Sequence, residues 1–329
     1  MKTIAFFNNK GGVGKTTLVY HLASMMAERG ETVVAVDLDP QANLTSMFLT
    51  EDALEVLWPN GEHPKTIFGA LRPIIRGVGD VQSPHVEQIN VRLGLVVGDL
   101  ALSTFEDKLS DAWPRCHNRD ESAFRTMTAF YRGVRQAAMH FGATWILIDV
   151  GPNLGAINRA ALIASERVVI PLGPDLFSLQ GLRNLGPSLR TWRASWTELR
   201  GKSPDPGLDL PAGKIEPLGY VVMQHGMREN RPPKAYQRWI DRFPAAYRES
   251  VLDEPPSSTL SAGEDPYCLA MLKHYRSLMP MAMEARKPVF VLKPADGAIG
   301  AHGEAVRNAY GDFLRLAQRI AERSGAVLP

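Results

Sequence analysis

The chain has 329 residues, of which 45% are hydrophobic and 22% charged, as in an ordinary globular protein with a large buried core and one or two domains. Its formal net charge is only +2, which excludes a general attraction to nucleic acid. Any contact with nucleic acid must therefore come from a local basic patch.

The first predicted element is a strand over Thr3–Phe7, followed at once by the glycine-rich run Asn8–Thr17. A strand that breaks into glycines and ends in Gly-Lys-Thr before a helix is typical of a phosphate-binding loop, or P-loop. Glycines let backbone N–H groups curl around an anion, and the start of the helix adds partial positive charge. Lys15 would reach the β- and γ-phosphates, and the Thr16 hydroxyl would hold Mg²⁺.

This P-loop departs from the ordinary pattern at its mouth, where Asn9 replaces a glycine and a second lysine, Lys10, follows. The run Lys-Gly-Gly-Val-Gly-Lys-Thr-Thr resembles the deviant Walker A motif of the ParA/MinD family of ATPases. The resemblance implies that ATP and Mg²⁺ are bound, and that Lys10 reaches across an ATP-dependent homodimer to the partner's nucleotide. It assigns the nucleotide contacts to Gly11, Gly12, Val13, Gly14, Lys15, Thr16 and Thr17.

The second predicted strand, Thr32–Asp37, ends in the motif Asp37-Leu38-Asp39-Pro40. Carboxylates two residues apart at a strand's end point to one face, toward the crevice where open α/β sheets bind ligands. By resemblance to the family, Asp39 positions the attacking water and Asp37 supports the Mg²⁺ shell. Taken alone, this motif is more often a helix-entry cap, but the neighbouring P-loop favours the nucleotide role.

A third apolar strand, Trp145–Asp149, is interpreted as the Walker B strand, with Asp149 holding Mg²⁺ through water. The alternative is that Asp149 only forms a turn. The family usually continues with Asp-x-Pro-Pro, whereas this chain has Gly151 at the first proline position. How the turn after Asp149 moves is therefore left open.

The remaining elements complete the expectation of an α/β fold, a doubly wound and mostly parallel sheet with helices on both faces. We expect one P-loop ATPase domain over residues 1–329, with less regular insertions around 50–143 and 201–266. The further predicted strands are Arg92–Val97, Arg167–Leu172, Gly219–Met223 and Pro288–Leu292. The predicted helices are Thr17–Arg29, Gly181–Leu199, Lys234–Val251 and Gly300–Arg323, and the predicted surface loops are Gly201–Gly213 and Asp253–Pro266.

Two further groups of residues are assigned by resemblance. Met223 and Gln224 occupy the place where family members contact the adenine base, although a plain strand end is an equal alternative. A locally basic segment could follow a DNA backbone through Arg228, Arg231, Lys234, Arg238 and Arg242. Its alternative is an ordinary solvated helix face, and Trp239 and Phe243 in the same segment are predicted to be core.

No apolar run approaches the ~20 residues of a membrane span, and the N-terminal strand leaves no room for a signal peptide. The mixed C-terminal tail does not favour a membrane anchor. Cys116 and Cys268 lie far apart without metal-ligand spacing, which fits a reducing compartment. We therefore expect a soluble cytoplasmic protein, associated with the nucleoid if it binds DNA.

These patterns lead to a functional hypothesis, an ATPase of the ParA type. The resemblance implies an ATP-dependent dimer that binds nonspecific DNA, is stimulated by a ParB-like protein or a cargo adaptor, and partitions DNA or a large cargo. The absence of an identifiable arginine finger favours slow hydrolysis. The alternative is an ATP-gated regulatory or sensor subunit of a multiprotein assembly, such as a defence system. A metabolic P-loop enzyme is disfavoured because no substrate motif is evident.

Overall fold

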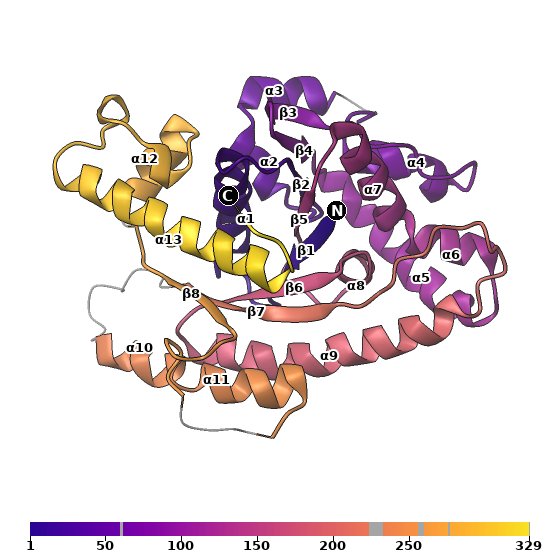
Figure 1. Ribbon diagram of the computed structural model, residues 1–329. Helices are drawn as coiled ribbons and strands as arrows, with labels where there is room; N and C mark the ends of the chain where they lie inside the picture. The colour runs from indigo at the N-terminus through magenta and orange to yellow at the C-terminus, as the bar shows by residue number, and fades with distance from the viewer. Residues whose placement is uncertain (60–61, 224–232, 256–259, 276, 329) are drawn as a thin grey trace.

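The computed structural model describes residues 1–59, 62–223, 233–255, 260–275 and 277–328. Within these residues the centre is an eight-stranded sheet in the order β3-β4-β2-β5-β1-β6-β7-β8 (Figure 1). β3 runs antiparallel to β4, and the other neighbouring strands pair in parallel, which confirms the predicted α/β sheet. The strands are β1 (Lys2–Phe6), β2 (Val33–Asp37), β3 (Glu87–Asn90), β4 (Leu93–Val96), β5 (Trp145–Asp149), β6 (Arg167–Leu172), β7 (Glu216–Met223) and β8 (Cys268–Leu272).

Helices cover both faces of the sheet (Figure 1). One face packs against α1 (Lys15–Glu28), α2 (Asn43–Phe48), α3 (Glu51–Leu57), α12 (Leu278–Ala285) and α13 (Ala301–Arg323). The other face packs against α4 (Ile67–Arg76), α5 (Phe105–His117), α6 (Glu121–Met127), α7 (Ala129–Phe141), α8 (Ala156–Ile163), α9 (Leu176–Arg200), α10 (Pro233–Ile240) and α11 (Phe243–Ala246).

Strand residues divide between the two cores by simple alternation. In β1, Ile4 and Phe6 enter the core beneath α1 and α13, whereas Ala5 enters the core beneath α5–α9. Because successive strand side chains point to opposite faces, a strand apolar at every position can be covered on both sides. This is why the parallel strands appear in the sequence as continuous apolar runs.

The predicted strand Pro288–Leu292 is wrong, and the final strand is instead β8. Residues Val289–Val291 form a short 3₁₀ turn, η3, whose Val289 and Phe290 side chains are buried against α1 and α13. A short apolar run is equally compatible with a buried strand and a buried turn, so the pattern alone could not separate them.

The predicted continuous helix Lys234–Val251 is also corrected. It is divided into α10, α11 and a π-helical segment, η2 (Tyr247–Leu252). Pro244 lacks the N–H that a helix interior needs, so a new helical segment starts beside it. Phe243 is fully buried and Trp239 is partly buried, in agreement with their predicted core role.

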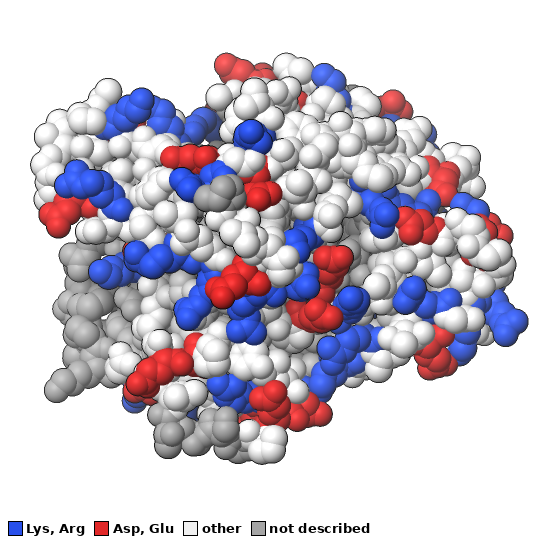
Figure 2. All heavy atoms as spheres, viewed as in Figure 1, with Lys and Arg blue, Asp and Glu red and all other residues white. Residues whose placement is uncertain are grey.

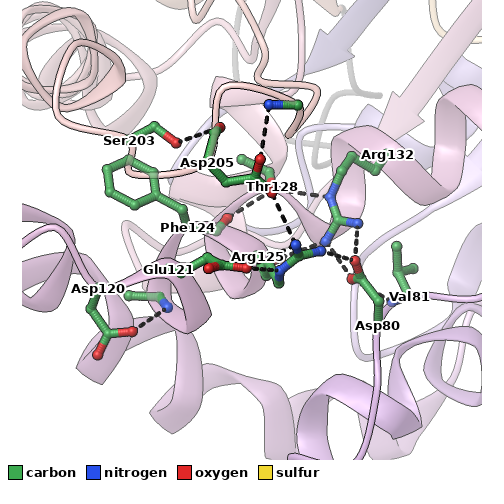
Figure 3. A network of polar contacts seen from close by, with 12 residues as sticks. Asp80, Val81, Asp120, Glu121, Phe124, Arg125, Thr128, Arg132, Ser203 and Asp205 are labelled. Atoms are coloured by element: carbon green, nitrogen blue, oxygen red, sulfur yellow. Dashed lines mark hydrogen bonds and ion pairs between the residues drawn. The ribbon is translucent and has the colours of Figure 1, made fainter.

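The stretch 50–143, expected to be less regular, is largely helical and carries α3 to α7. A network of ion pairs joins this stretch to the loop at residues 201–213 (Figure 3). Asp80 accepts both terminal nitrogens of the nearly buried Arg132 at 2.7 and 2.8 Å, and it also accepts from Arg125 at 2.7 Å. Arg125 reaches Asp205 in the loop at 3.0 Å. The two regions that the sequence left without a role are therefore fastened to each other.

The outer edge of β8 is contacted by two arginines of α13. Arg319 Nη1 donates to the carbonyl oxygen of Cys268 at 2.9 Å, and Arg323 Nη1 donates to that of Pro266 at 2.7 Å. The Tyr267 carbonyl between them faces β7 and accepts the Tyr220 N–H. Because successive strand carbonyls point in opposite directions, the Cys268 carbonyl faces away from the sheet.

A buried histidine joins the first helix to η3. His21 Nδ1 lies 2.7 Å from the Thr17 carbonyl oxygen, and its Nε2 accepts the Val289 N–H at 3.1 Å. The ring also stacks on Phe313 of α13 at a centroid distance of 4.8 Å. Burial lowers the pKa of His21 from 6.5 to about 4, partly opposed by the bond to Thr17. The neutral ring is the form that can both donate and accept here.

We expect His21 to make the folded state weaker in mild acid. Because its folded pKa lies below the unfolded value, its contribution is complete above pH 6.5 and is lost as the pH falls toward 4, by about 3 kcal/mol. Urea unfolding between pH 7.5 and 4.5 should show a shallower fall of unfolding free energy for His21→Gln than for the wild type. The exposed His85→Gln variant is the control, and equal slopes for all three would contradict the prediction.

Candidate nucleotide site

The site forms where the carboxyl ends of three parallel strands meet. In the sheet register, Asp149 at the end of β5 lies opposite Asp37 of β2 on one side and Phe6 of β1 on the other. Open α/β sheets bind ligands at this edge, where neighbouring strands connect in opposite directions. The register therefore brings the P-loop after β1 beside both predicted acidic motifs.

The P-loop has the backbone that its glycines predict. Gly12 and Gly14 have φ values of +71° and +88°, in the left-handed region that other residues rarely adopt. Asn8 braces the loop, because its Nδ2 donates to the Pro171 carbonyl at 2.7 Å and its Oδ1 accepts the Lys10 N–H at 2.9 Å. Helix α1 then begins at Lys15, so its N-terminal N–H groups face the loop.

Lys15 is held among acidic groups beneath this loop. Its side chain is buried, and its Nζ donates to the Lys10 carbonyl at 3.4 Å. Burial lowers the pKa of Lys15, while the nearby Asp149 and Asp39 carboxylates oppose that shift. A partly desolvated amine beside a nest of N–H groups is suited to bind a phosphate.

Asp149 is the unsatisfied group of the site. It is fully buried, and within the described part of the chain no hydrogen bond of good geometry reaches either carboxylate oxygen, although the Thr16 hydroxyl lies near enough to affect its pKa. Burial raises the pKa of Asp149 well above its usual value and Asp37 adds to the shift, whereas the Thr16 hydroxyl and Lys15 oppose it. A buried carboxylate without a partner is costly, so this group is suited to a cation or its bound water.

Asp37 is held differently from Asp149. Its Oδ2 accepts both the backbone N–H and the hydroxyl of Thr45, each at 2.8 Å. The same hydroxyl accepts the Gly98 N–H at 2.8 Å, and a Cβ on Gly98 would lie 2.8 Å from the Asp37 carboxyl carbon. Burial raises the pKa of Asp37 to about 7, and the bonds to Thr45 lower it. Thr45 and Gly98 were missed in the sequence because no spacing rule links them to Asp37.

Asp39 lies at the edge of the same cluster. It is 7% exposed, and its Oδ1 accepts the Gln41 N–H at 3.0 Å, a local turn bond that does not cap α2, whose N-cap is Ala42. A Cβ built on Gly151 would lie 3.4 Å from that oxygen. The helix-entry cap is therefore wrong for Asp39, which instead lies close enough to Lys15 to oppose the lowering of its pKa.

Lys10 lies at the mouth of the P-loop and forms an ion pair with Asp175. Both side chains remain about one-third exposed, at 29% and 32%. The other Asp175 oxygen caps α9 by accepting the Ser178 N–H at 2.8 Å, which explains why α9 begins five residues before its predicted start. The Phe177 ring lies 5.9 Å from Lys10 Nζ.

The donor set fits Mg²⁺ bound together with a phosphate. Thr16 and Asp149 would hold it, with Asp37 behind them, and when bound it would neutralise phosphate charge. The described residues contain no group of three His, Cys, Asp or Glu side chains placed to bind a metal on their own. Mg²⁺ usually keeps several bound waters and takes further ligands from substrate phosphates, so one or two protein ligands are enough to place it.

The predicted base and DNA contacts are only partly described. Met223 ends β7 and is 8% exposed, while Gln224, Arg228 and Arg231 lie outside the described residues, as does the Lys234 side chain. Arg238 and Arg242 are exposed and lie 4.5 and 5.5 Å from the Trp239 ring centre. Arg248, in the same basic segment, is instead buried in an ion pair with Asp265.

Comparison with known proteins agrees with this arrangement. A family model described as an AAA domain matches residues 1–198, which is more than half of the chain. The chain belongs to the ParA/MinD family of P-loop ATPases. One curated family member, the sporulation initiation inhibitor protein Soj of Bacillus subtilis, is 30% identical over 189 residues, which are 57% of this chain and 65% of Soj. The chain spans 42 to 65% of the length of Soj and of several other curated relatives that it matches.

Solved structures extend the family likeness to nearly the whole fold. A protein of Corynebacterium diphtheriae is 26% identical, with a TM-score of 0.68 over 87% of this chain and 97% of its own. An ATP complex of a variant of McdA from Cyanothece is 16% identical and shares the fold, with a TM-score of 0.60 over 99% of this chain and 97% of McdA. Among the described residues, no helix has the length and hydropathy to cross a membrane.

We expect Asp149→Asn to stabilise the nucleotide-free protein while removing the effect of Mg²⁺ on nucleotide binding. The substitution removes a fully buried carboxylate for which the cost of burial outweighs the opposing effects of the Thr16 hydroxyl and Lys15, so unfolding free energy should rise by about 1–3 kcal/mol. Thermal unfolding followed by ADP titration with and without Mg²⁺ measures both effects. Asp111→Asn, at a side chain that is 63% exposed, is the control. A less stable Asn variant, or one whose ADP affinity still rises with Mg²⁺, would contradict the assignment.

Proposed function

We propose that this ParA/MinD-family ATPase uses ATP to pair two copies of itself, and that hydrolysis ends the pairing. The observation that carries the proposal is the position of Lys10 at the P-loop mouth, where it is partly exposed and forms an ion pair with the similarly exposed Asp175. Ion pairs of this exposure are worth about 1 kcal/mol or less. Lys10 can therefore leave Asp175 for a more highly charged phosphate.

Exposed apolar side chains beside the P-loop support a pairing face there. Leu176 is 49% exposed and Phe177 is 71% exposed, directly after Asp175. Leu154, which follows the turn in contact with the P-loop, is 39% exposed. Apolar groups gathered at the mouth of a binding site are a common mark of a protein interface.

The proposed division of labour follows from the charges of the site. Lys15 would neutralise the β- and γ-phosphates, and Lys10 of the paired copy would add a second positive charge. Asp39, at the rim, would orient the attacking water. Phosphoryl transfer needs positioning and charge neutralisation more than covalent chemistry, so these groups suffice for slow turnover.

Size measurement with ATP tests this pairing. We expect Asp39→Ala to accumulate as an ATP-bound dimer because hydrolysis is blocked, and Lys10→Ala to bind ATP yet remain monomeric. Light scattering after size-exclusion chromatography, with the nucleotide content measured in each peak, separates the two outcomes. Lys65→Ala, which removes an exposed lysine elsewhere, is the matched control. If Lys10→Ala pairs as the wild type does, the proposed role of Lys10 in trans is wrong.

We further propose that the dimer binds DNA without sequence preference and serves partition or positioning of a cargo, with a partner protein stimulating hydrolysis. On the face in Figure 2, basic and acidic side chains are interspersed, and no broad basic field is present among the described residues there. Support for DNA contact comes instead from Arg238 and Arg242, which are exposed on and directly after α10. Pairing two copies would double this local charge.

Salt dependence tests the DNA contact. With ATP present, the double variant Arg238→Ala/Arg242→Ala should weaken duplex binding equally for unrelated sequences. The plot of log K against log salt should become less steep by about 2 for each copy of the chain that contacts DNA. Arg76→Ala, at another exposed arginine, is the control. If the wild type shows no ATP-dependent DNA retention even at low salt, the alternative of a regulatory subunit in a multiprotein assembly is favoured.

A further inference from the structure

The turn after β5 lies beside both the P-loop and Asp39. A Cβ on Gly11 of the P-loop would lie 3.9 Å from Pro152 Cγ, and a Cβ on Gly151 would lie 3.4 Å from Asp39 Oδ1. The turn therefore lies close to both the P-loop and the carboxylate proposed to orient water. Any shift of the turn changes the room available to Asp39.

A buried asparagine side chain holds this turn. Asn158 is 1% exposed, and its Nδ2 lies 2.9 Å from the Gly151 carbonyl oxygen and 2.6 Å from that of Asn153. The Asn153 side-chain oxygen lies 3.0 Å from the same nitrogen and also accepts the Gly155 N–H at 2.8 Å. The turn is thus hydrogen-bonded to α8, because Asn158 is the third residue of that helix.

Helix α8 is in turn fixed by a residue far away in the sequence. Its N-cap, Gly155, has no side chain to bond the first N–H groups. The Glu106 carboxylate of α5 accepts the N–H of Ala156 at 2.5 Å and that of Ile157 at 2.9 Å. A carboxylate bonded to two N–H groups at a helix start is favoured by both charge and hydrogen bonding.

The fit between Glu106 and α8 leaves no spare room. A Cβ on Gly155 would lie 2.6 Å from Glu106 Oε1 and 2.8 Å from Asn153 Oδ1. Glycine at this position lets the carboxylate approach the helix end. A second contact between α5 and α8 runs nearby, where the Arg159 guanidinium lies 4.4 Å from the ring centre of Trp113.

We propose that Glu106 is a positioning residue for ATP hydrolysis, because it fixes α8 and, through Asn158, the Gly151–Asn153 turn beside Asp39. The proposal rests on the proposed ATPase function and gives the helical stretch 50–143 a task, since its helix α5 supplies the anchor. Glu106 touches no reacting group. Its effect should therefore fall on turnover and not on nucleotide affinity.

Glu106→Gln tests this role with little change of size. It retains one acceptor oxygen but places an NH₂ group against an N–H group that needs an acceptor. We expect kcat for ATP to fall by about fivefold or more, while KM for ATP and the Kd for ADP stay within about twofold. Asp107→Asn, at the exposed neighbour of Glu106 on α5, should leave all three unchanged.

A second readout does not depend on activity. In nucleotide-free protein, amide hydrogen exchange over residues 150–157 should be faster in Glu106→Gln than in the wild type, with the exchange of β1 and β5 unchanged. Asn158→Ser should reproduce both the loss of kcat and the local exchange, so the proposal stays testable if Glu106→Gln folds poorly. The double variant should be little worse than either single variant, because both act through one chain of contacts.

The outcomes separate this proposal from the proposed function. A wild type without ATPase activity would defeat the proposed function, while the exchange measurement would still decide whether Glu106 holds the turn. Unchanged kcat together with unchanged exchange in both variants would overturn the positioning role. A parallel loss of ADP affinity and kcat, or faster exchange throughout the sheet, would also overturn it, because either would indicate a general structural role.

Discussion

The site depends on one electrostatic constraint, the burial of the Asp37 and Asp149 carboxylates at the ends of neighbouring strands with Lys15 as the nearby amine. In a buried site with a low effective dielectric constant, charges interact more strongly than in water. An unpaired charge there lowers the stability of the fold. The two apolar cores on either side of the sheet keep these strands in register and so hold the carboxylates together despite that cost. The site is therefore suited to bind a cation together with an anion.

The two carboxylates bear this constraint in different ways. Asp37 is satisfied by Thr45, and its environment is closed by Gly98, so it is a fixed part of the site's wall. Asp149 has free acceptor capacity and faces Lys15. The two carboxylates thus differ because their surroundings differ: Asp37 is already hydrogen-bonded, whereas Asp149 can still accept bonds from a ligand. Such differences are common where acidic residues share a site.

The sequence predicted the parts of this molecule in which one residue type at one spacing has a single physical meaning. The P-loop glycines, the strand-ending aspartates and the apolar runs of the parallel strands are of this kind. It failed at Pro288–Leu292, where burial without periodicity fits a strand or a turn. It also could not reveal that Glu106 reaches α8 or that Asp175 pairs with Lys10, because such contacts depend on how distant helices pack. No local pattern of residues encodes that packing.

The arginines along the rim of β8 have a consequence for how copies of the chain meet. An open strand at the end of a sheet is a template on which another molecule's strand can extend the ladder, often as the first step of aggregation. Here Arg319 bonds the outward Cys268 carbonyl at the start of that strand, and Arg323 bonds the carbonyl of Pro266, two residues earlier. Another strand could pair with these two carbonyls only by displacing the guanidinium groups that bond them. Strand addition is thereby disfavoured at the start of β8, the part of this edge that the two arginines cover.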